Sequence, residues 1–217
     1  HTPHEKVLLI LSPMVQKKRI FLLGIALLLT VWAAGARSPK REMRGTWIAT
    51  VDNIDWPRQA GVRNAEQQQA DLVAILDNAV ACNLNCVVFQ IRPTADAFYR
   101  SAHEPWSHWL TGLQGVEPTY DPLAFLIEEC DKRGLAVHVW VNPYRIWLNE
   151  ANLSGETRSQ IYTRYADWLV AYGKTLYFHP AREAARNHVA NVVADIFLLY
   201  TSPSPRDLST SRMPSSA

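Results

Sequence analysis

The sequence predicts an α/β fold in which buried parallel strands alternate with helices. Three short apolar segments, 44–51, 86–91 and 135–141, have the length of strands, and the last two are apolar at nearly every position. Strands of a parallel sheet show this pattern because helices cover both of their faces. The segments 64–80 and 122–133 between them carry apolar residues at helical spacing. The order strand, helix, strand, helix, strand therefore favours a parallel sheet covered by helices.

Helix start and stop signals support this division. Asn64 stands where the first helix should begin, with Gln67 three residues on as a loose capping box. Asp121 precedes a proline at the start of the second helix, and Gly134 follows its end. We therefore expect Asp121 to act as a helix cap and not as a ligand.

A barrel and an open doubly wound sheet both satisfy this order of elements. The first strand is followed by no Gly-x-Gly-x-x-Gly motif, and no segment matches the full Gly-x-x-x-x-Gly-Lys-Ser/Thr pattern of a phosphate-binding loop. A barrel is therefore favoured. Segment 44–197 is well short of the about 250 residues of a whole barrel. The prediction is a partial, truncated (β/α)8 TIM barrel that holds roughly the first three to four βα units.

The first 43 residues are predicted to lie outside this domain. Segment 14–36 joins a basic start, an apolar run and the small residues Ala34-Gly35-Ala36, as a secretory signal peptide does. The apolar run is shorter than the about 20 residues of a membrane span. We expect residues 1–13 to be upstream translation and 37–43 a linker. The protein is then exported to the periplasm or cell envelope, and it touches a membrane only through 14–36 if that segment stays uncleaved.

The other end of the chain changes character abruptly. Apolar residues keep helical spacing from Val189 to Phe197, and segment 198–217 is then rich in Ser, Pro and Arg. A disordered natural tail and a non-native sequence from an adapter or vector both fit this composition. We favour the non-native origin, under which the native chain continues past about Phe197.

Charge and cysteine usage narrow the classes of partner. A net charge of +2 with scattered basic residues predicts no nucleic-acid partner. Cys82, Cys86 and Cys130 lack the spacing of a zinc site, so we expect no metal and no cofactor, and buried thiols in preference to a disulfide. The 8 tryptophans are many for this length, and they suit a large core or a flat ligand.

Polar and aromatic residues follow all three predicted strands. In a barrel, the carboxyl ends of the strands form the active face. Aromatic rings stack on the apolar faces of sugars, while amide, carboxylate and guanidinium groups bind the hydroxyls. A polysaccharide is therefore the expected partner. The candidate substrate-binding residues are Asp52, Gln90, Arg92, Asp96, Tyr99, Trp140, Asn142 and Tyr144.

Other residues have simpler structural interpretations. Trp47 lies in the middle of a strand, so we expect it in the core. His138 lies inside the third strand and is expected to be a satisfied core group. Trp106 and Trp109 either fix the long loop 94–120 or face a ligand. Among the candidates, Arg92 and Asn142 are the strongest.

Three motifs together resemble the glycosyl-hydrolase-like family 10, which are bacterial envelope proteins with a TIM-barrel domain. They are Arg-Gly-Thr-Trp-Ile-Ala-Thr-Val at 44–51, Phe-Gln-Ile-Arg-Pro at 89–93 with Asp-Ala-Phe-Tyr at 96–99, and Val-Trp-Val-Asn-Pro-Tyr-Arg at 139–145. Segment 177–189 resembles the part of the family that precedes its fourth core strand. The resemblance covers 44–197 and implies a glycoside hydrolase that acts on an envelope glycan, with peptidoglycan foremost.

The resemblance also implies a fourth strand with Asp-Gly-Ile/Val-x-x-Asp-Asp-Tyr after the helix at 189–197. The sequence has Leu-Tyr-Thr-Ser-Pro-Ser-Pro at 199–205 instead. Glycosidases need two carboxyl groups at the scissile bond. Because the acidic strand that the resemblance implies is missing from this sequence, the catalytic residues are unknown. We expect this chain to be inactive and poorly soluble. The alternatives are a non-catalytic exported glycan-binding protein and an envelope scaffold held by an uncleaved N-terminal helix.

Overall fold

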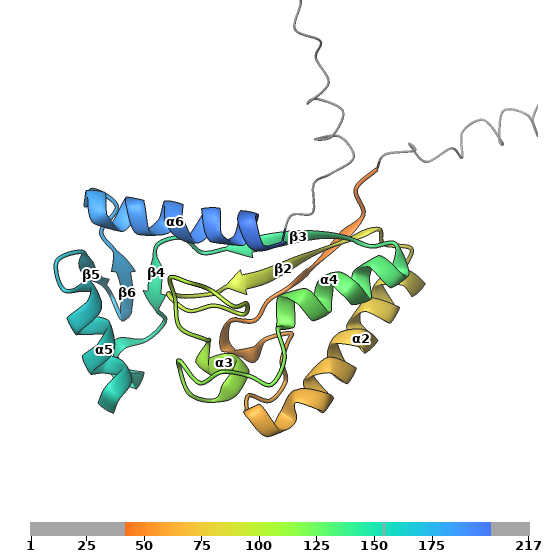
Figure 1. Ribbon diagram of the computed structural model, residues 1–217, viewed down its shortest axis with the longest axis horizontal. Helices are drawn as coiled ribbons and strands as arrows, with labels where there is room; N and C mark the ends of the chain where they lie inside the picture. Colours follow the sequence, from red (N-terminus) through yellow and green to blue (C-terminus); the bar gives the residue numbers. More distant parts are fainter. Residues whose placement is uncertain (1–41, 154, 201–217) are drawn as a thin grey trace, which may run out of the picture. The chain divides into compact units, whose positions relative to one another are not determined.

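The computed structural model of the protein describes residues 42–153 and 155–200 (Figure 1). The predictions for 1–13, for the signal peptide at 14–36 and for most of the linker and tail lie outside these ranges. Within the described ranges, no helix is long and apolar enough to cross a membrane.

A parallel sheet of three strands forms the centre of the fold. Strands β1 (Gly45–Ile48), β2 (Cys86–Arg92) and β3 (Ala136–Val141) lie in the order β1-β2-β3. Helices α2 (Ala65–Ala81) and α4 (Pro122–Arg133) connect them and cover one face of the sheet (Figure 1). The predicted α/β fold with a parallel sheet is confirmed.

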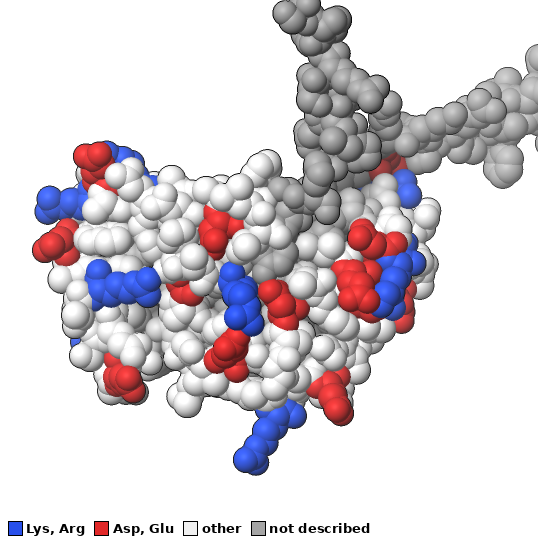
Figure 2. Space-filling model, viewed as in Figure 1, with Lys and Arg blue, Asp and Glu red and all other residues white. Residues whose placement is uncertain are grey.

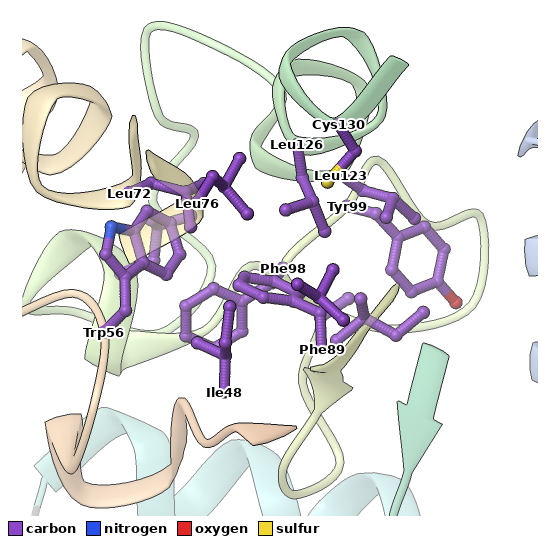
Figure 3. Close-up of a cluster of buried hydrophobic side chains, with 14 of the residues drawn as sticks. Ile48, Trp56, Leu72, Leu76, Phe89, Phe98, Tyr99, Leu123, Leu126 and Cys130 are labelled. Atoms are coloured by element: carbon purple, nitrogen blue, oxygen red, sulfur yellow. The ribbon is translucent and has the colours of Figure 1, made fainter. Parts of the chain in front are cut away.

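The main core lies between this sheet and the two helices (Figure 3). Ile48 and Phe89 are register partners on neighbouring strands, and both are buried. Leu72 and Leu76 of α2 and Leu126 of α4 pack against them from the helix side. Burial of each such side chain stabilises the fold by about 1.5–3 kcal/mol. The spacing of these residues in the sequence is what predicts both helices.

The caps of α4 are confirmed, and the cap of α2 is not. Asp121 Oδ1 accepts hydrogen bonds from the backbone N–H groups of Leu123 and Ala124, both at 3.0 Å. Gly134 ends α4 with a φ of 66°, a left-handed conformation that glycine adopts readily. Asn64 stands at the start of α2, but its side chain donates to the carbonyl of Ala60 at 3.0 Å. The predicted capping box is therefore wrong, because the side-chain amide of Asn64 bonds the preceding turn and not the first turn of α2.

Strand β3 is more exposed than its apolar sequence predicts. Trp47, Val88 and His138 are register partners and share the sheet face opposite α2 and α4. Trp47 is 63% exposed and His138 is also exposed, so both predictions of core positions are wrong. The reason is that no described helix covers this face of the sheet. Cys82 is likewise exposed, whereas Cys86 and Cys130 are buried free thiols as expected.

A second, antiparallel sheet follows β3, and the sequence analysis does not predict it. Strands β4 (Arg145–Trp147), β5 (Leu169–Tyr172) and β6 (Thr175–Phe178) lie in the order β4-β6-β5, with α5 (Gly155–Tyr165) between β4 and β5. Their buried side chains form a separate cluster around Ile146, Leu176 and Phe178.

The remaining elements are short turns and one long helix. The helix α3 (His108–Thr111) interrupts the loop after β2. Helix α6 (Glu183–Tyr200) continues past Phe197, the point where the sequence pattern predicts its end. Three 3-10 turns complete the described chain: η1 (Val51–Asn53), η2 (Val62–Asn64) and η3 (Glu150–Asn152).

Candidate carbohydrate-binding edge

The carboxyl ends of β1 and β2 are tied together by the side chain of Gln90. Its Oε1 accepts hydrogen bonds from the backbone N–H groups of Thr50 and Val51, each at 2.9 Å. The hydroxyl of Thr50 donates to the Gln90 carbonyl at 2.8 Å. Gln90 is fully buried, and among the described residues its Nε2 has no hydrogen-bond partner. The side chain therefore fixes how the chain leaves β1.

Arg92 joins the ends of β2 and β3. Its Nε donates to Glu104 Oε2 at 2.6 Å, and a second guanidinium nitrogen, Nη2, donates to Glu104 Oε1. The remaining nitrogen, Nη1, donates to the carbonyl of Asn142, just after β3. His188 Nε2 of α6 lies 3.0 Å from Glu104 Oε1. One buried ion pair thus holds two strand ends, the loop after β2 and helix α6.

Asp96 is the third buried polar group of the loop after β2. Its Oδ1 accepts a hydrogen bond from the hydroxyl of Thr94 at 2.8 Å, and its Oδ2 lies 3.3 Å from His108 Nδ1. Burial lowers the pKa of Arg145, and the negative charge of Asp96 partly opposes that effect. Asp96 is thus the carboxylate next to both His108 and Arg145.

Four of the predicted binding residues have no surface for a direct contact. Gln90, Arg92, Asp96 and Tyr99 are each fully buried. Burial also raises the pKa of Tyr99 above its ordinary value, so the phenol stays neutral. In this structure Gln90 and Arg92 hold the strand ends, whereas Asp96 lies in the loop after β2 and Tyr99 in the main core.

The other predicted binding residues reach the surface. Asp52 is exposed and has a left-handed backbone with a φ of 57°, which is unusual for a residue with a side chain. Trp140, Asn142 and Tyr144 are half-buried. Trp140 Nε1 donates to Asn142 Oδ1 at 2.9 Å, and Asn142 Nδ2 donates to the carbonyl of Pro93 at 3.1 Å. These bonds fix the orientation of the indole.

Trp47 adds a second indole beside Trp140. The two ring centroids lie 5.2 Å apart with an interplanar angle of 75°, an edge-to-face arrangement. Trp47 belongs to β1 and Trp140 to β3, so the pair spans β2, where their register partners are Val88 and Gln90. We name Asp52, Trp47, Trp140, Asn142 and Tyr144 the carboxyl edge. Two flat indole rings lie against each other beside the Asn142 amide, while Asp52 and Tyr144 follow the ends of β1 and β3. Flat apolar rings beside hydrogen-bonding groups suit a sugar.

Two residues near the edge, Glu104 and Trp147, were not predicted from the sequence. Glu104 lies in the loop after β2 and Trp147 in the short strand β4, and neither segment has an apolar period. Trp109 is buried in the main core and Trp106 packs against it, so both fix the loop, which is one of the two roles expected for them. Of Glu104 and Trp147, only Glu104 could have been proposed from the sequence, because it is a carboxylate in the same loop as the buried Asp96.

On the face shown in Figure 2, acidic and basic side chains are interspersed and do not form a field of one sign. The described residues also include exposed ion pairs, such as Arg100 with Glu117. In the portion of the chain that the structure describes, no three His, Cys, Asp or Glu side chains gather as metal ligands would.

Comparison with known proteins agrees with the geometry. Residues 42–202 match the sequence profile of the family described as Glycosyl hydrolase-like 10. The chain is 43% identical over 179 residues to glycosyl hydrolase YngK of Bacillus subtilis, covering 82% of this chain and 35% of that protein. It is 32% identical over 188 residues to glycosyl hydrolase DigH of Escherichia coli, covering 77% of this chain and 43% of that protein.

Among solved structures, the chain is similar to the galactosidase domain of the α-galactosidase-sucrose kinase AgaSK. The TM-score is 0.44 at 14% identity, covering 73% of this chain and 20% of that one. The Listeria monocytogenes protein lmo2446 gives a TM-score of 0.41 at 12% identity, covering 74% and 16% of the two chains.

The sequence comparisons, unlike these structural ones, are close enough to decide membership. The matched segment begins just before β1 and includes the whole described sheet. The chain spans less than half the length of the two curated relatives. The protein belongs to the Glycosyl hydrolase-like 10 family.

Proposed function

We propose that this chain is the glycan-binding part of an exported glycoside hydrolase that acts on a bacterial envelope glycan, with peptidoglycan as the foremost substrate. The single observation that carries the proposal is the carboxyl edge, where Trp140 is held by Asn142 beside the exposed ring of Trp47. Family membership supports hydrolysis, and the sequence of residues 14–36 supports export.

The parallel sheet supports the finer proposal of a (β/α)8 barrel. In such a barrel, β1, β2 and β3 supply the first three strands, and their carboxyl ends lie on the active face. The antiparallel sheet then stands as an insertion after β3, on the same side as the loop 93–120. Both insertions begin at a strand's carboxyl end, where loops of this fold carry its chemistry.

Hydrolysis of a glycosidic bond needs an acid and a second carboxyl group on opposite sides of the bond. Two of the described carboxylates near the edge are held in hydrogen bonds within the protein, and a third is exposed. Asp96 is buried against Thr94 and His108, and Asp55 Oδ2 accepts from the backbone N–H of Ala49 at 2.7 Å. Asp52 is exposed. We therefore propose that the edge binds the glycan and that the catalytic pair needs at least one carboxylate from outside the described residues.

Release of soluble fragments from purified peptidoglycan by the longer gene product tests the proposal. Activity that falls in a Trp140→Ala variant, and not in a Tyr172→Ala variant, supports it, since Tyr172 is 82% exposed on β5. Absence of fragments from peptidoglycan and from neutral polysaccharides would contradict it. Retention on the glycan without fragments would favour the non-catalytic glycan-binding protein, for which the same carboxyl edge suffices.

A further inference from the structure

A small pocket lies outside the carboxyl edge, between α3, β4 and α5. Its volume is about 150 Å³. Residues from four segments line it: His108, Gly112, Leu113, Gln114, Trp147, Asn152, Leu153 and Thr157. Leu113 and Asn152 are exposed at its rim, while Trp147 and Leu153 are buried beneath. We name it the His108 pocket.

His108 is held in one orientation by its neighbours. Its Nδ1 faces the buried carboxylate of Asp96 at 3.3 Å. Its ring stacks on Trp147 with centroids 4.3 Å apart and an interplanar angle of 24°, and its centroid lies 4.0 Å from that of Trp109. When a carboxylate accepts from Nδ1–H, the neutral imidazole keeps Nε2 as an acceptor. No described residue hydrogen-bonds Nε2, so this atom is available to a ligand.

The lining identifies the chemical class of the ligand. It contains two amides, a hydroxyl and an imidazole beside one indole and two leucines, and it contains no Asp, Glu, Lys or Arg. Such a lining offers donors and acceptors to a neutral, hydroxyl-rich molecule, and it gives a charged ligand no counter-charge. Its volume is below the about 300–1,000 Å³ of pockets for drug-sized ligands, so it suits one ring and not an oligomer.

We infer that the His108 pocket is a subsite for a single neutral sugar residue of the glycan, with His108 Nε2 accepting a hydroxyl or amide proton. The inference rests on the proposed function, because it assigns the pocket to the same glycan. Asp96 is a positioning residue in this arrangement, since it is buried and orients the imidazole. Gln114 and Thr157 complete the polar lining from the loop and from α5.

Calorimetric titration of the chain with N-acetylglucosamine trimer and with cellotriose tests the inference. Gln114→Ala should weaken binding about tenfold, and Thr157→Phe should abolish it by filling the pocket. Two control variants should bind as the parent chain does. Gln67→Ala alters an exposed glutamine of α2 bonded to Asp71, and Thr163→Phe adds the same ring to an exposed position on α5.

Binding of either trimer that both pocket variants weaken supports the inference. Unchanged binding in Thr157→Phe overturns it, and so does the absence of binding by the folded parent chain. Circular dichroism of each variant separates lost binding from lost folding. A failure of the proposed function can be told apart from a failure of this inference. The proposed function is tested by glycan cleavage by the longer protein and by the Trp140→Ala variant, and Trp140 does not line this pocket.

Discussion

Arg92 and Glu104 form a two-point ion pair that is closed to solvent. The guanidinium belongs to the end of β2 and the carboxylate to the loop 12 residues further along, and neither side chain is more than 1% exposed. The same carboxylate also meets His188 of α6, and the same guanidinium holds the carbonyl of Asn142. The carboxyl ends of β2 and β3 are therefore positioned by one buried electrostatic network.

Removing one partner of this pair should be costly. Arg92→Ala leaves Glu104 buried without its guanidinium, and loss of one member of a buried pair costs about 3–5 kcal/mol. Arg100→Ala is the matched control, because Arg100 and Glu117 form an exposed pair with side chains 72% and 57% exposed. That variant should lose no more than about 1 kcal/mol. Urea unfolding followed by circular dichroism measures both, and equal losses would contradict the assignment.

Gln90 should contribute to stability by holding the backbone at the end of β1. In Gln90→Leu the buried N–H groups of Thr50 and Val51 lose their acceptor, which at about 1–3 kcal/mol each predicts a loss of about 2–6 kcal/mol. Removal of the unpaired Nε2 offsets part of this cost. Amide hydrogen exchange at Thr50 and Val51 should accelerate. Gln67→Leu, on the exposed face of α2, should change stability by less than about 0.5 kcal/mol. Unaltered exchange at Thr50 and Val51 in Gln90→Leu would contradict this role of Gln90.

Tyr165 should make the protein sensitive to alkali. Burial raises the pKa of Tyr165 from 10.0 to about 12, and the charge of Glu104 acts in the same direction. Between these values the folded state keeps a proton that the unfolded state has lost, so the free energy of unfolding falls as pH rises. For a single such phenol, the fall is at most about 1.4 kcal/mol for each pH unit in this window.

Tyr165→Phe removes that contribution together with a buried hydroxyl that has no partner among the described residues. Its stability at pH 7 should equal or exceed that of the parent chain, and its loss from pH 10 to 12 should be smaller. Tyr172→Phe, at an 82% exposed position, should follow the parent chain throughout. Urea midpoints measured across this pH range give the comparison, and parallel curves for all three proteins would contradict the prediction.

An apolar groove on the outer side of β3 should limit solubility. Side chains of β3, α4 and α6 line a groove of about 390 Å³, and Val139 and Val193 in it are 43% and 50% exposed. Large exposed apolar surfaces promote association. Val193→Lys should raise soluble yield and lower the fluorescence of bound anilinonaphthalene sulfonate. Val80→Lys places the same change at a 45% exposed position on α2, outside the groove, and should leave both unchanged. Equal effects from the two variants would show that the groove has no special role.

The sequence is sufficient to predict the parallel sheet and its two connecting helices. Cys86 to Ile91 is apolar at nearly every position and buried throughout, and Asp121 with Gly134 marks both ends of α4. These elements are predictable because their signals are local: a hydrophobic period, a capping side chain and a glycine with positive φ. Asn64 shows the limit, since a nearby carbonyl competes for the same side chain.

The site is predictable only in outline. The position of Trp140 and Asn142 at the end of β3 follows from the strand assignment, but the exposure of Trp47 depends on which sheet face the helices cover. The pairing of Asp96 with His108 depends on the fold of a loop without any period. Strands β4, β5 and β6 are three or four residues long, too short for an alternating pattern to distinguish them.

The most direct test of the central claim is binding of soluble peptidoglycan glycan strands to this chain, compared between the parent protein, Trp140→Ala and Tyr172→Ala. Circular dichroism should first show that all three are folded. If the carboxyl edge binds the glycan, Trp140→Ala should bind at least about tenfold more weakly, a loss of about 1.4 kcal/mol, while Tyr172→Ala binds as the parent does. Equal binding by all three folded proteins, or no binding by the parent, would contradict the assignment of the edge.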